Sequence, residues 1–111
     1  MRKLNNRENN SDDFYRSLFW ERAREQCISD CCGLDLYALF VQRRIELGGT
    51  VHHIMPLDDY PQLRLEQDNL ICISEANHRL VHSLYSEGKF RETSALLRDI
   101  KRRFCRGELP G

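Results

Sequence analysis

All four histidines of the chain lie within 31 consecutive positions. His52 and His53 are adjacent in the β-branched and apolar run Thr50–Met55, which favours a short strand. His78 and His82 are four residues apart in a later segment that favours a helix. Neighbouring side chains on a strand point to opposite faces, whereas residues four apart in a helix share one face. A fold that brings the histidines together must therefore place a short strand against a helix, with one of the adjacent pair joining His78 and His82.

The segments around the histidines also favour short elements. Apolar residues recur at helical spacing, and Gly48-Gly49 and Gly88 separate one element from the next. Ser74 can cap the helix that follows it, and the polar stretch 57–68 favours a loop. The predicted elements are helices over about 14–27, 35–47, 75–87 and 89–105 and strands over about 50–55 and 69–73.

The length and composition of the chain fit one small domain. With 111 residues, of which 41% are hydrophobic and 31% are charged, a second core has little room. We predict an α+β fold, with a flexible polar arm at 1–12, one domain over 13–106 and a tail at 107–111. No stretch approaches the roughly 20 apolar residues of a membrane span. The N-terminus lacks the apolar core of a signal peptide, so we expect a cytoplasmic protein with no membrane partner.

The histidine pattern predicts a metal site with open coordination positions. His78 and His82 can offer two imidazoles to one cation, and one residue of the adjacent pair can supply a third. Three protein ligands leave room for water or a phosphate oxygen, which a catalytic metal needs. The remaining histidine of the adjacent pair is then free for another task, such as general base catalysis.

Three segments carry a resemblance to a known family. Residues 51–57, 68–71 and 77–82 read VHHIMPL, DNLI and NHRLVH. In residue type, order and interval they resemble the HNH motif of the ββα-metal endonucleases. The run 14–27, which begins FYRS, also resembles the segment that precedes this motif in small phage-encoded HNH proteins.

The resemblance implies a role for each residue of the motif. His52 resembles the first metal ligand, and His53 resembles the general base that activates the attacking water. Asn69 resembles the residue that pins the loop between the strands and so orients His53. His78 and His82 resemble the other two ligands. One divalent cation is implied, and Mg²⁺, Mn²⁺, Ni²⁺ and Zn²⁺ remain open.

The resemblance also implies a fold and an activity. A ββα-metal motif at about 50–87, flanked by helices, would hydrolyse DNA phosphodiester bonds with weak sequence preference and leave 5′-phosphate and 3′-hydroxyl ends. A phage context would make terminase or other DNA-packaging proteins partners. One alternative is a catalytically silent DNA-binding or packaging-assembly subunit that keeps the fold. Another is a structural domain held by a metal, which gives His53 no reason to stand beside His52.

One departure from the family concerns zinc. Many HNH proteins hold a structural zinc with two Cys-x-x-Cys pairs, and the second pair falls where this chain has Ser74 and Asn77. We therefore expect no zinc ribbon, and we expect the predicted helix 35–47 to pack in its place. The alternative is a metal site formed by the cysteines at positions Cys27, Cys31, Cys32 and Cys72.

The C-terminal helix is strongly basic. Residues 89–106 hold seven Lys and Arg against two Asp and Glu, a net charge of +5. If an apolar stripe at Leu97, Ile100 and Phe104 faces the core, several basic side chains are left exposed. Such a face can follow a DNA backbone, although it can also be no more than a solvated surface. The candidate DNA contacts are Arg79, Arg98, Lys101 and Arg102.

Overall fold

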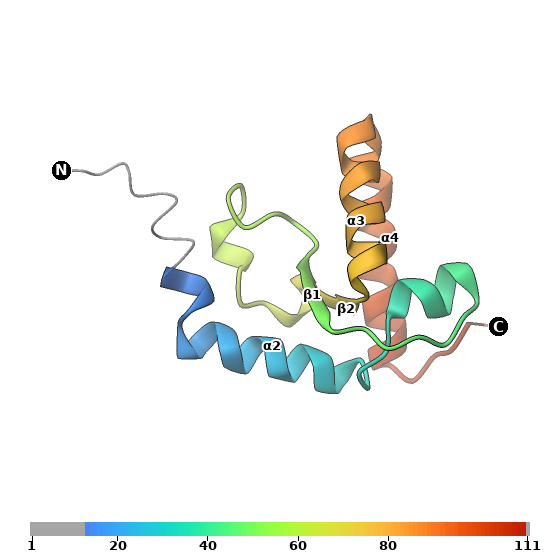
Figure 1. Ribbon diagram of the computed structural model, residues 1–111, viewed down its shortest axis with the longest axis horizontal. Helices are drawn as coiled ribbons and strands as arrows, with labels where there is room; N and C mark the ends of the chain where they lie inside the picture. Colours follow the sequence, from blue (N-terminus) through green and yellow to red (C-terminus); the bar gives the residue numbers. More distant parts are fainter. Residues whose placement is uncertain (1–12, 111) are drawn as a thin grey trace.

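The computed structural model describes residues 13–110, and the arm predicted at 1–12 lies outside the described residues. The fold is α+β, as predicted (Figure 1). Its regular elements in chain order are α2 (Leu18–Asp30), a π-helical turn (Ala38–Gln42), β1 (Thr50–His53), β2 (Leu70–Ile73), α3 (Glu75–Leu84), a second π-helical turn (Tyr85–Lys89) and α4 (Phe90–Cys105). Two 3-10 turns, Pro61–Leu63 and Gln67–Asn69, lie in the loop between the strands.

The two strands form an antiparallel hairpin that lies between the helices. His52 pairs with Ile71 and His53 with Leu70, so the register sets both histidines opposite buried apolar residues. In Figure 1, α2 runs along one side of the hairpin, while α3 and α4 rise from the other side. The strands are shorter than predicted, because pairing stops at His53. The Ile54 N–H still donates to the Asn69 carbonyl at 2.8 Å.

The core is built around β2. All four residues of this strand are fully buried, so it contributes to both faces of the hairpin. The helices cover it with a small set of side chains, as expected for a domain of this size. The buried apolar residues contributed by the helices include Trp20, Cys27, Val81, Leu97 and Ile100.

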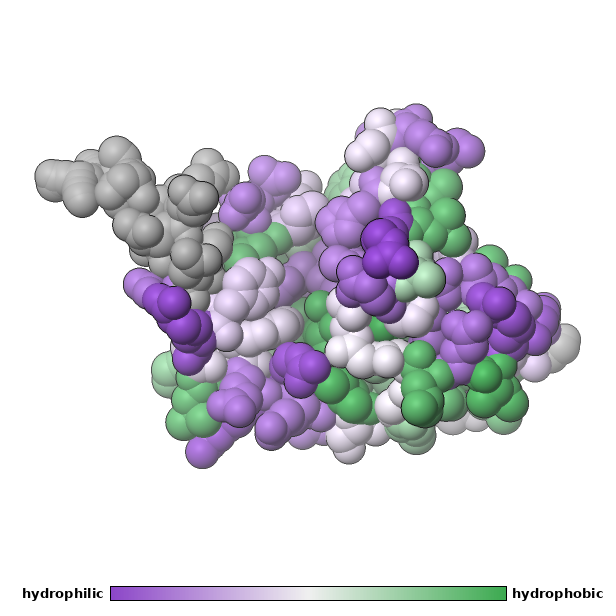
Figure 2. Space-filling model, in the orientation of Figure 1, coloured by the Kyte–Doolittle hydropathy of each residue, from purple (hydrophilic) through white to green (hydrophobic). Residues whose placement is uncertain are grey.

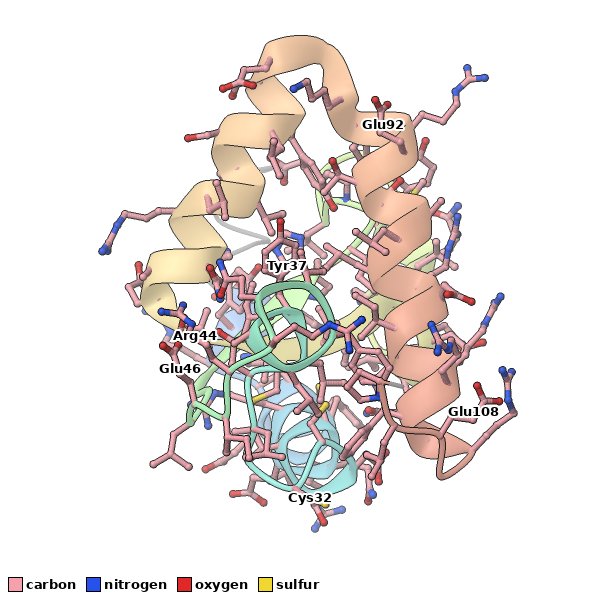
Figure 3. The ribbon with its side chains drawn as sticks, turned by 90° about the vertical axis from the view of Figure 1, so that its right-hand side faces the viewer. Cys32, Tyr37, Arg44, Glu46, Glu92 and Glu108 are labelled. Carbon is pink, nitrogen blue, oxygen red and sulfur yellow. The ribbon has the colours of Figure 1, made fainter. Side chains whose placement is uncertain are left out.

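Helices α3 and α4 are the two helices that the sequence predicted on either side of Gly88. The Ser74 hydroxyl caps α3 by accepting from the Asn77 N–H at 3.2 Å. Gly88 has a φ of 87°, in the left-handed region that glycine adopts without strain, and it turns the chain between the two helices. The helices lie side by side in Figures 1 and 3. This arrangement fixes which face of α3 meets the hairpin.

The helix predicted over 35–47 is wrong beyond Gln42. Arg43 adopts a left-handed conformation with a φ of 58°, and this ends the helical segment. The residues that follow have no regular structure apart from an isolated bridge between Leu47 and Leu34, and Ile45 and Leu47 are 81% and 77% exposed. The apolar spacing of these residues suggested a buried stripe, but they point into solvent instead. Apolar side chains also gather along the lower edge of the face in Figure 2, while the region around α3 is mainly hydrophilic.

The prediction that Lys101 lies on the exposed side of its helix is also wrong, and this removes the basis on which Lys101 was a candidate DNA contact. Its side chain is only 2% exposed, and its Nζ donates to the carbonyls of Gln67 at 2.7 Å and Leu70 at 2.6 Å. The long apolar stem of lysine lets an ammonium group cross the core to reach these two oxygens. Helical periodicity alone could not identify carbonyls that lie more than 30 residues earlier in the chain.

Replacing Lys101 with methionine should lower the free energy of unfolding by about 2–4 kcal/mol. Methionine keeps most of the apolar stem, but it leaves two buried carbonyls without a charged donor. Urea denaturation measures the change. The matched control is Arg102→Met, because Arg102 makes only an exposed ion pair with Asp68 at 3.3 Å and should cost at most about 1 kcal/mol. Equal effects in the two variants would contradict the structural role of Lys101.

In the part of the chain that the structure describes, no helix is both long and apolar enough to cross a lipid bilayer.

Candidate metal centre

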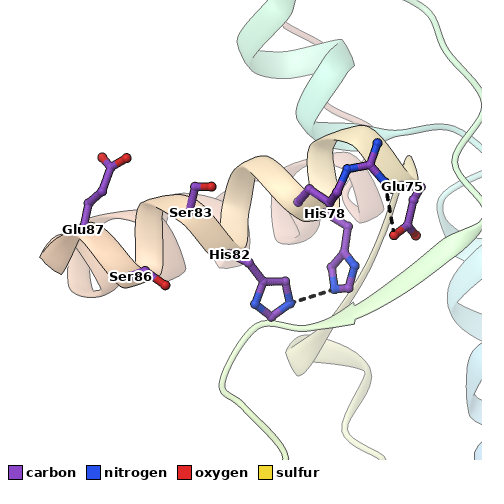
Figure 4. A pocket seen from close by; sticks show the side chains of 7 residues that line it. Glu75, His78, His82, Ser83, Ser86 and Glu87 are labelled. Carbon is purple, nitrogen blue, oxygen red and sulfur yellow. Dashed lines mark hydrogen bonds and ion pairs between the residues drawn. The ribbon is translucent and has the colours of Figure 1, made fainter.

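Three of the four histidines converge on one point. The ring nitrogens that His52, His78 and His82 can offer to a metal all lie within 4.8 Å of one another. His78 Nε2 and His82 Nε2 are 3.0 Å apart. Figure 4 shows both imidazoles projecting from one side of α3 toward β1. Across residues 13–110, this is the only group of three or more His, Cys, Asp and Glu side chains close enough to share an ion.

The spacing of nitrogens fits a metal ion. Two imidazole nitrogens bound about 2.1 Å from a common ion lie about 3.0–3.4 Å apart for bond angles between octahedral and tetrahedral values. The distance between His78 and His82 falls in this range without any movement of α3. In the metal-free chain one of these two nitrogens must carry a hydrogen, because two bare lone pairs would repel each other. A metal ion would take the place of that hydrogen.

The three imidazoles form a gradient from core to solvent. His52 is 3% exposed, His78 is half-buried and His82 is exposed. An ion held between them is therefore seated against the hairpin but can be reached from outside. An open groove runs beside the two helical imidazoles (Figure 4). Its lining consists of Glu75, His78, Arg79, His82, Ser83, Ser86 and Glu87.

Burial keeps the inner ligands neutral. Burial, together with the neighbouring His78 and His82, lowers the pKa of His52 to about 3. Burial also lowers the pKa of His78, with His82 adding to the effect. A neutral imidazole offers a lone pair to a metal, whereas a protonated one does not. Near neutral pH, these two residues therefore need not lose a proton before an ion binds.

Tyr85 fixes the hydrogen of His52. The Tyr85 hydroxyl has one hydrogen, and it donates this hydrogen to the Ile54 carbonyl at 2.7 Å. In its 3.2 Å contact with His52 Nε2 the hydroxyl must therefore accept, so Nε2 carries the ring hydrogen. The free lone pair of His52 is then on Nδ1. Sequence reasoning missed Tyr85, although it continues the helical spacing of His78 and His82 on one face.

Replacing Tyr85 with phenylalanine should weaken metal binding by about 10–100-fold. Partners that orient a metal ligand typically contribute this much to affinity. Phenylalanine keeps the edge-on packing of the ring against Phe90 and loses only the hydroxyl. Titration calorimetry with Ni²⁺ measures the affinity, and nitrogen NMR shifts of His52 report its tautomer. Tyr60→Phe serves as the control. Unchanged affinity together with an unchanged tautomer would show that Tyr85 does not orient the ligand.

His53 points away from the other three histidines. Its ring stacks on Trp20, with centroids 5.0 Å apart and planes 24° apart. Its Nε2 lies 3.1 Å from the Arg64 carbonyl, which can only accept, so Nε2 carries the hydrogen and Nδ1 keeps the lone pair. Burial lowers the pKa of His53, and the carbonyl of Arg64 partly opposes this effect. The separation of the adjacent pair agrees with the prediction from strand geometry.

Asn69 pins the loop that holds His53. Its Oδ1 accepts from the Met55 N–H at 2.7 Å, and its Nδ2 donates to the carbonyls of Met55 at 3.1 Å and Leu63 at 3.3 Å. These bonds tie the start of the loop to the residue just before Arg64, whose carbonyl accepts from His53. The position of Asn69 is the one expected for a residue that orients His53 through the loop.

The cysteines of the alternative metal site are divided between core and surface. Cys27, Cys31 and Cys72 are fully buried, while Cys32 is exposed. No group of three cysteines at described positions brings its sulfur atoms as close together as the histidine nitrogens. The hydrogen bond to Cys31 and burial raise the pKa of the Cys27 thiol, as expected for a packing residue. The structure does not assemble the site proposed at Cys27, Cys31, Cys32 and Cys72.

Of the remaining candidate DNA contacts, one lies on α3 and two lie on α4. Arg79 borders the groove beside the histidines and pairs with Glu75 at 3.6 Å. Arg102 is exposed on α4 and pairs with Asp68, while Arg98 is partly buried on the same helix. Only Arg79 is thus part of the groove next to the candidate metal centre.

No family model matches the chain, and neither a curated protein nor a solved structure matches it significantly. The function is therefore argued from the residues and their geometry.

Proposed function

We propose that this chain is a metal-dependent endonuclease of the HNH type that hydrolyses DNA phosphodiester bonds. The observation that carries the proposal is the arrangement of four histidines about one short strand. His52 joins His78 and His82 on one side, while His53 is held by a backbone carbonyl on the other. The order β1, loop, β2 and α3 is that of a ββα-metal motif, and Asn69 bridges the loop where this motif would require it.

The metal would supply charge stabilisation. A divalent ion held by His52, His78 and His82 would stabilise the charge on the scissile phosphate and on the departing 3′ oxygen. Imidazole ligands suit Ni²⁺ and Zn²⁺ better than Mg²⁺ and Mn²⁺, which prefer oxygen ligands. The exposure of His82 and the open groove beside it leave a path for the phosphate.

His53 is suited to accept a proton from water. Its Nδ1 carries the lone pair, and the Arg64 carbonyl that accepts from Nε2 would stabilise the positive charge on the ring after proton transfer. The Tyr15 hydroxyl lies 3.5 Å from Nδ1 and marks the direction from which a water would approach. Tyr15 is 46% exposed and lies in the helical turn before α2, with its ring packed edge-on against Trp20, so the attacking water would have to take the place of the Tyr15 hydroxyl.

The same proposal covers the substrate and its context. Contacts made mainly to the phosphate backbone give little sequence preference. Arg79 is the cation best placed to contact a phosphate, because it borders the groove beside His78 and His82. Cleavage would leave 5′-phosphate and 3′-hydroxyl ends, and the proposed biological setting is DNA packaging in a phage.

A nicking assay tests the proposal. The purified chain is incubated with supercoiled plasmid and a panel of divalent ions, with EDTA as the control. We expect nicked product with at least one ion, none in EDTA, and ends that a DNA ligase can reseal. The catalytically silent alternative predicts retarded DNA in a gel-shift experiment but no cleavage with any ion. That outcome would falsify the endonuclease proposal.

A further inference from the structure

Asp35 is a fully buried carboxylate outside the histidine site. It accepts three hydrogen bonds of 2.8 Å each, from the Ala38 N–H at Oδ1 and from the Ser74 N–H and the Asn77 Nδ2 at Oδ2. Burial of a carboxylate is costly unless hydrogen bonds replace its water. All three donors are neutral amide groups, and they come from two segments nearly 40 residues apart.

The carboxylate lies where two helical segments begin. Ala38 is the first residue of one π-helical turn, and Ser74 is the N-cap of α3. Free N–H groups and the positive end of the helix dipole favour a negative charge at both places. Figure 3 looks onto the segment of Tyr37, which lies between the first turn of α3 and α4. One side chain therefore joins this segment to the start of α3.

Asn77 connects this carboxylate to the histidines. Besides donating to Asp35, it exchanges two hydrogen bonds of 3.0 Å with the side chain of Gln42. Asn77 is 4% exposed and immediately precedes His78. The His78 N–H in turn donates to the Ser74 carbonyl at 2.8 Å. The first turn of α3, from which His78 projects, is thus held on both sides by the buried cluster.

We propose that Asp35 is the positioning residue of the metal centre. It fixes the first turn of α3, and through that turn it sets the place of His78 relative to His52 on β1. The inference concerns the centre on which the proposed nuclease function rests, and its test uses metal binding without DNA. Asparagine has the same shape as aspartate, but it would turn its NH₂ group toward N–H donors on one side. The role therefore needs both acceptor oxygens of Asp35.

The test compares two variants of the full chain. Asp35→Asn should weaken Ni²⁺ binding by about 10–100-fold, the loss usual for groups that orient metal ligands. Leu97→Ala removes a fully buried side chain of α4 and destabilises the fold by leaving a cavity, so it should lower the melting temperature but keep the affinity. Titration calorimetry well below both melting temperatures measures Ni²⁺ binding, and thermal denaturation confirms that both variants are folded.

The outcomes separate the inference from the proposed function. Wild-type affinity in folded Asp35→Asn overturns the positioning role and leaves the metal centre intact. A wild-type chain that binds no Ni²⁺ overturns both. If Asp35→Asn does not fold, Asn77→Ala provides the measurement, because it removes the link to His78 and leaves the bond between Asp35 and Ser74. Its affinity should then fall about 10-fold, and an unchanged affinity overturns the inference.

Discussion

We expect that replacing His53 with alanine slows the proposed DNA cleavage by about 10²–10⁴-fold while metal affinity stays nearly unchanged. The reason is that His52 and His53 face opposite sides of β1 and have different proposed roles. His52 faces the metal ligands on α3, whereas His53 faces Trp20 and the Arg64 carbonyl. The variant therefore removes the proposed base and keeps all three candidate ligands. Nicking rates at saturating metal and calorimetric titration of the same preparation measure the two effects.

Val51→Ala is the control for the loss of His53. Val51 lies in the same strand and is partly buried, so its truncation tests whether damage to β1 alone slows the reaction. We expect the control to cleave at close to the wild-type rate. A strong loss of metal binding in His53→Ala would show that the roles of His52 and His53 are exchanged. A wild-type cleavage rate would remove His53 from the proposed mechanism.

Removing a candidate metal ligand should have the opposite effect from His53→Ala, because it should weaken metal binding. His78→Ala and His82→Ala should each abolish most of the thermal stabilisation that a metal gives to the wild-type chain. A metal at 100 times its dissociation constant stabilises the folded state by about 2.7 kcal/mol, and a variant that no longer binds loses that amount. Because His78 is half-buried and His82 is exposed, stability in EDTA should change little. Thermal denaturation with Ni²⁺ and with EDTA measures the difference.

His53→Ala is the internal control for the ligand variants, since it should keep the full stabilisation by Ni²⁺. If His78→Ala and His82→Ala also keep it, the ion binds elsewhere and the assignment of the centre fails. His52→Ala should lose the stabilisation as well, but His52 is 3% exposed, so its removal also affects the metal-free fold. The two helical histidines therefore give the cleaner test.

The convergence of the histidines could be predicted because it follows from local rules. The two-residue alternation of side chains along a strand separates His52 from His53, and the 3.6-residue repeat of a helix brings His78 and His82 together. The Ser74 cap and the break at Gly88 are also written in short stretches of sequence. The two strands pair over only four residues each, and α3 begins directly after β2. These short connections leave few ways to arrange the three imidazoles.

The parts that could not be predicted depend on contacts between distant segments. Asp35 and Asn77 are 42 positions apart, and nothing in either local sequence indicates that they meet. The sequence suggested that an apolar helix over 35–47 would pack in place of a zinc ribbon, and it gave no sign that a carboxylate of this segment would bind the start of α3. The helix itself ends early because Arg43 adopts a left-handed conformation, which an apolar repeat does not reveal.

The contact of Lys101 with the loop between the strands limits how far this scaffold can be shortened. The ammonium group of Lys101 donates to the carbonyls of Gln67 and Leu70, which flank Asn69. Helix α4 therefore helps to hold Asn69, the residue that bridges the loop around His53. A minimal fragment cut at residue 87 would keep every histidine and lose that anchor. Engineering that seeks a compact DNA-cutting module from this scaffold would have to retain α4, or rebuild its anchor from another segment, before any ligand is altered.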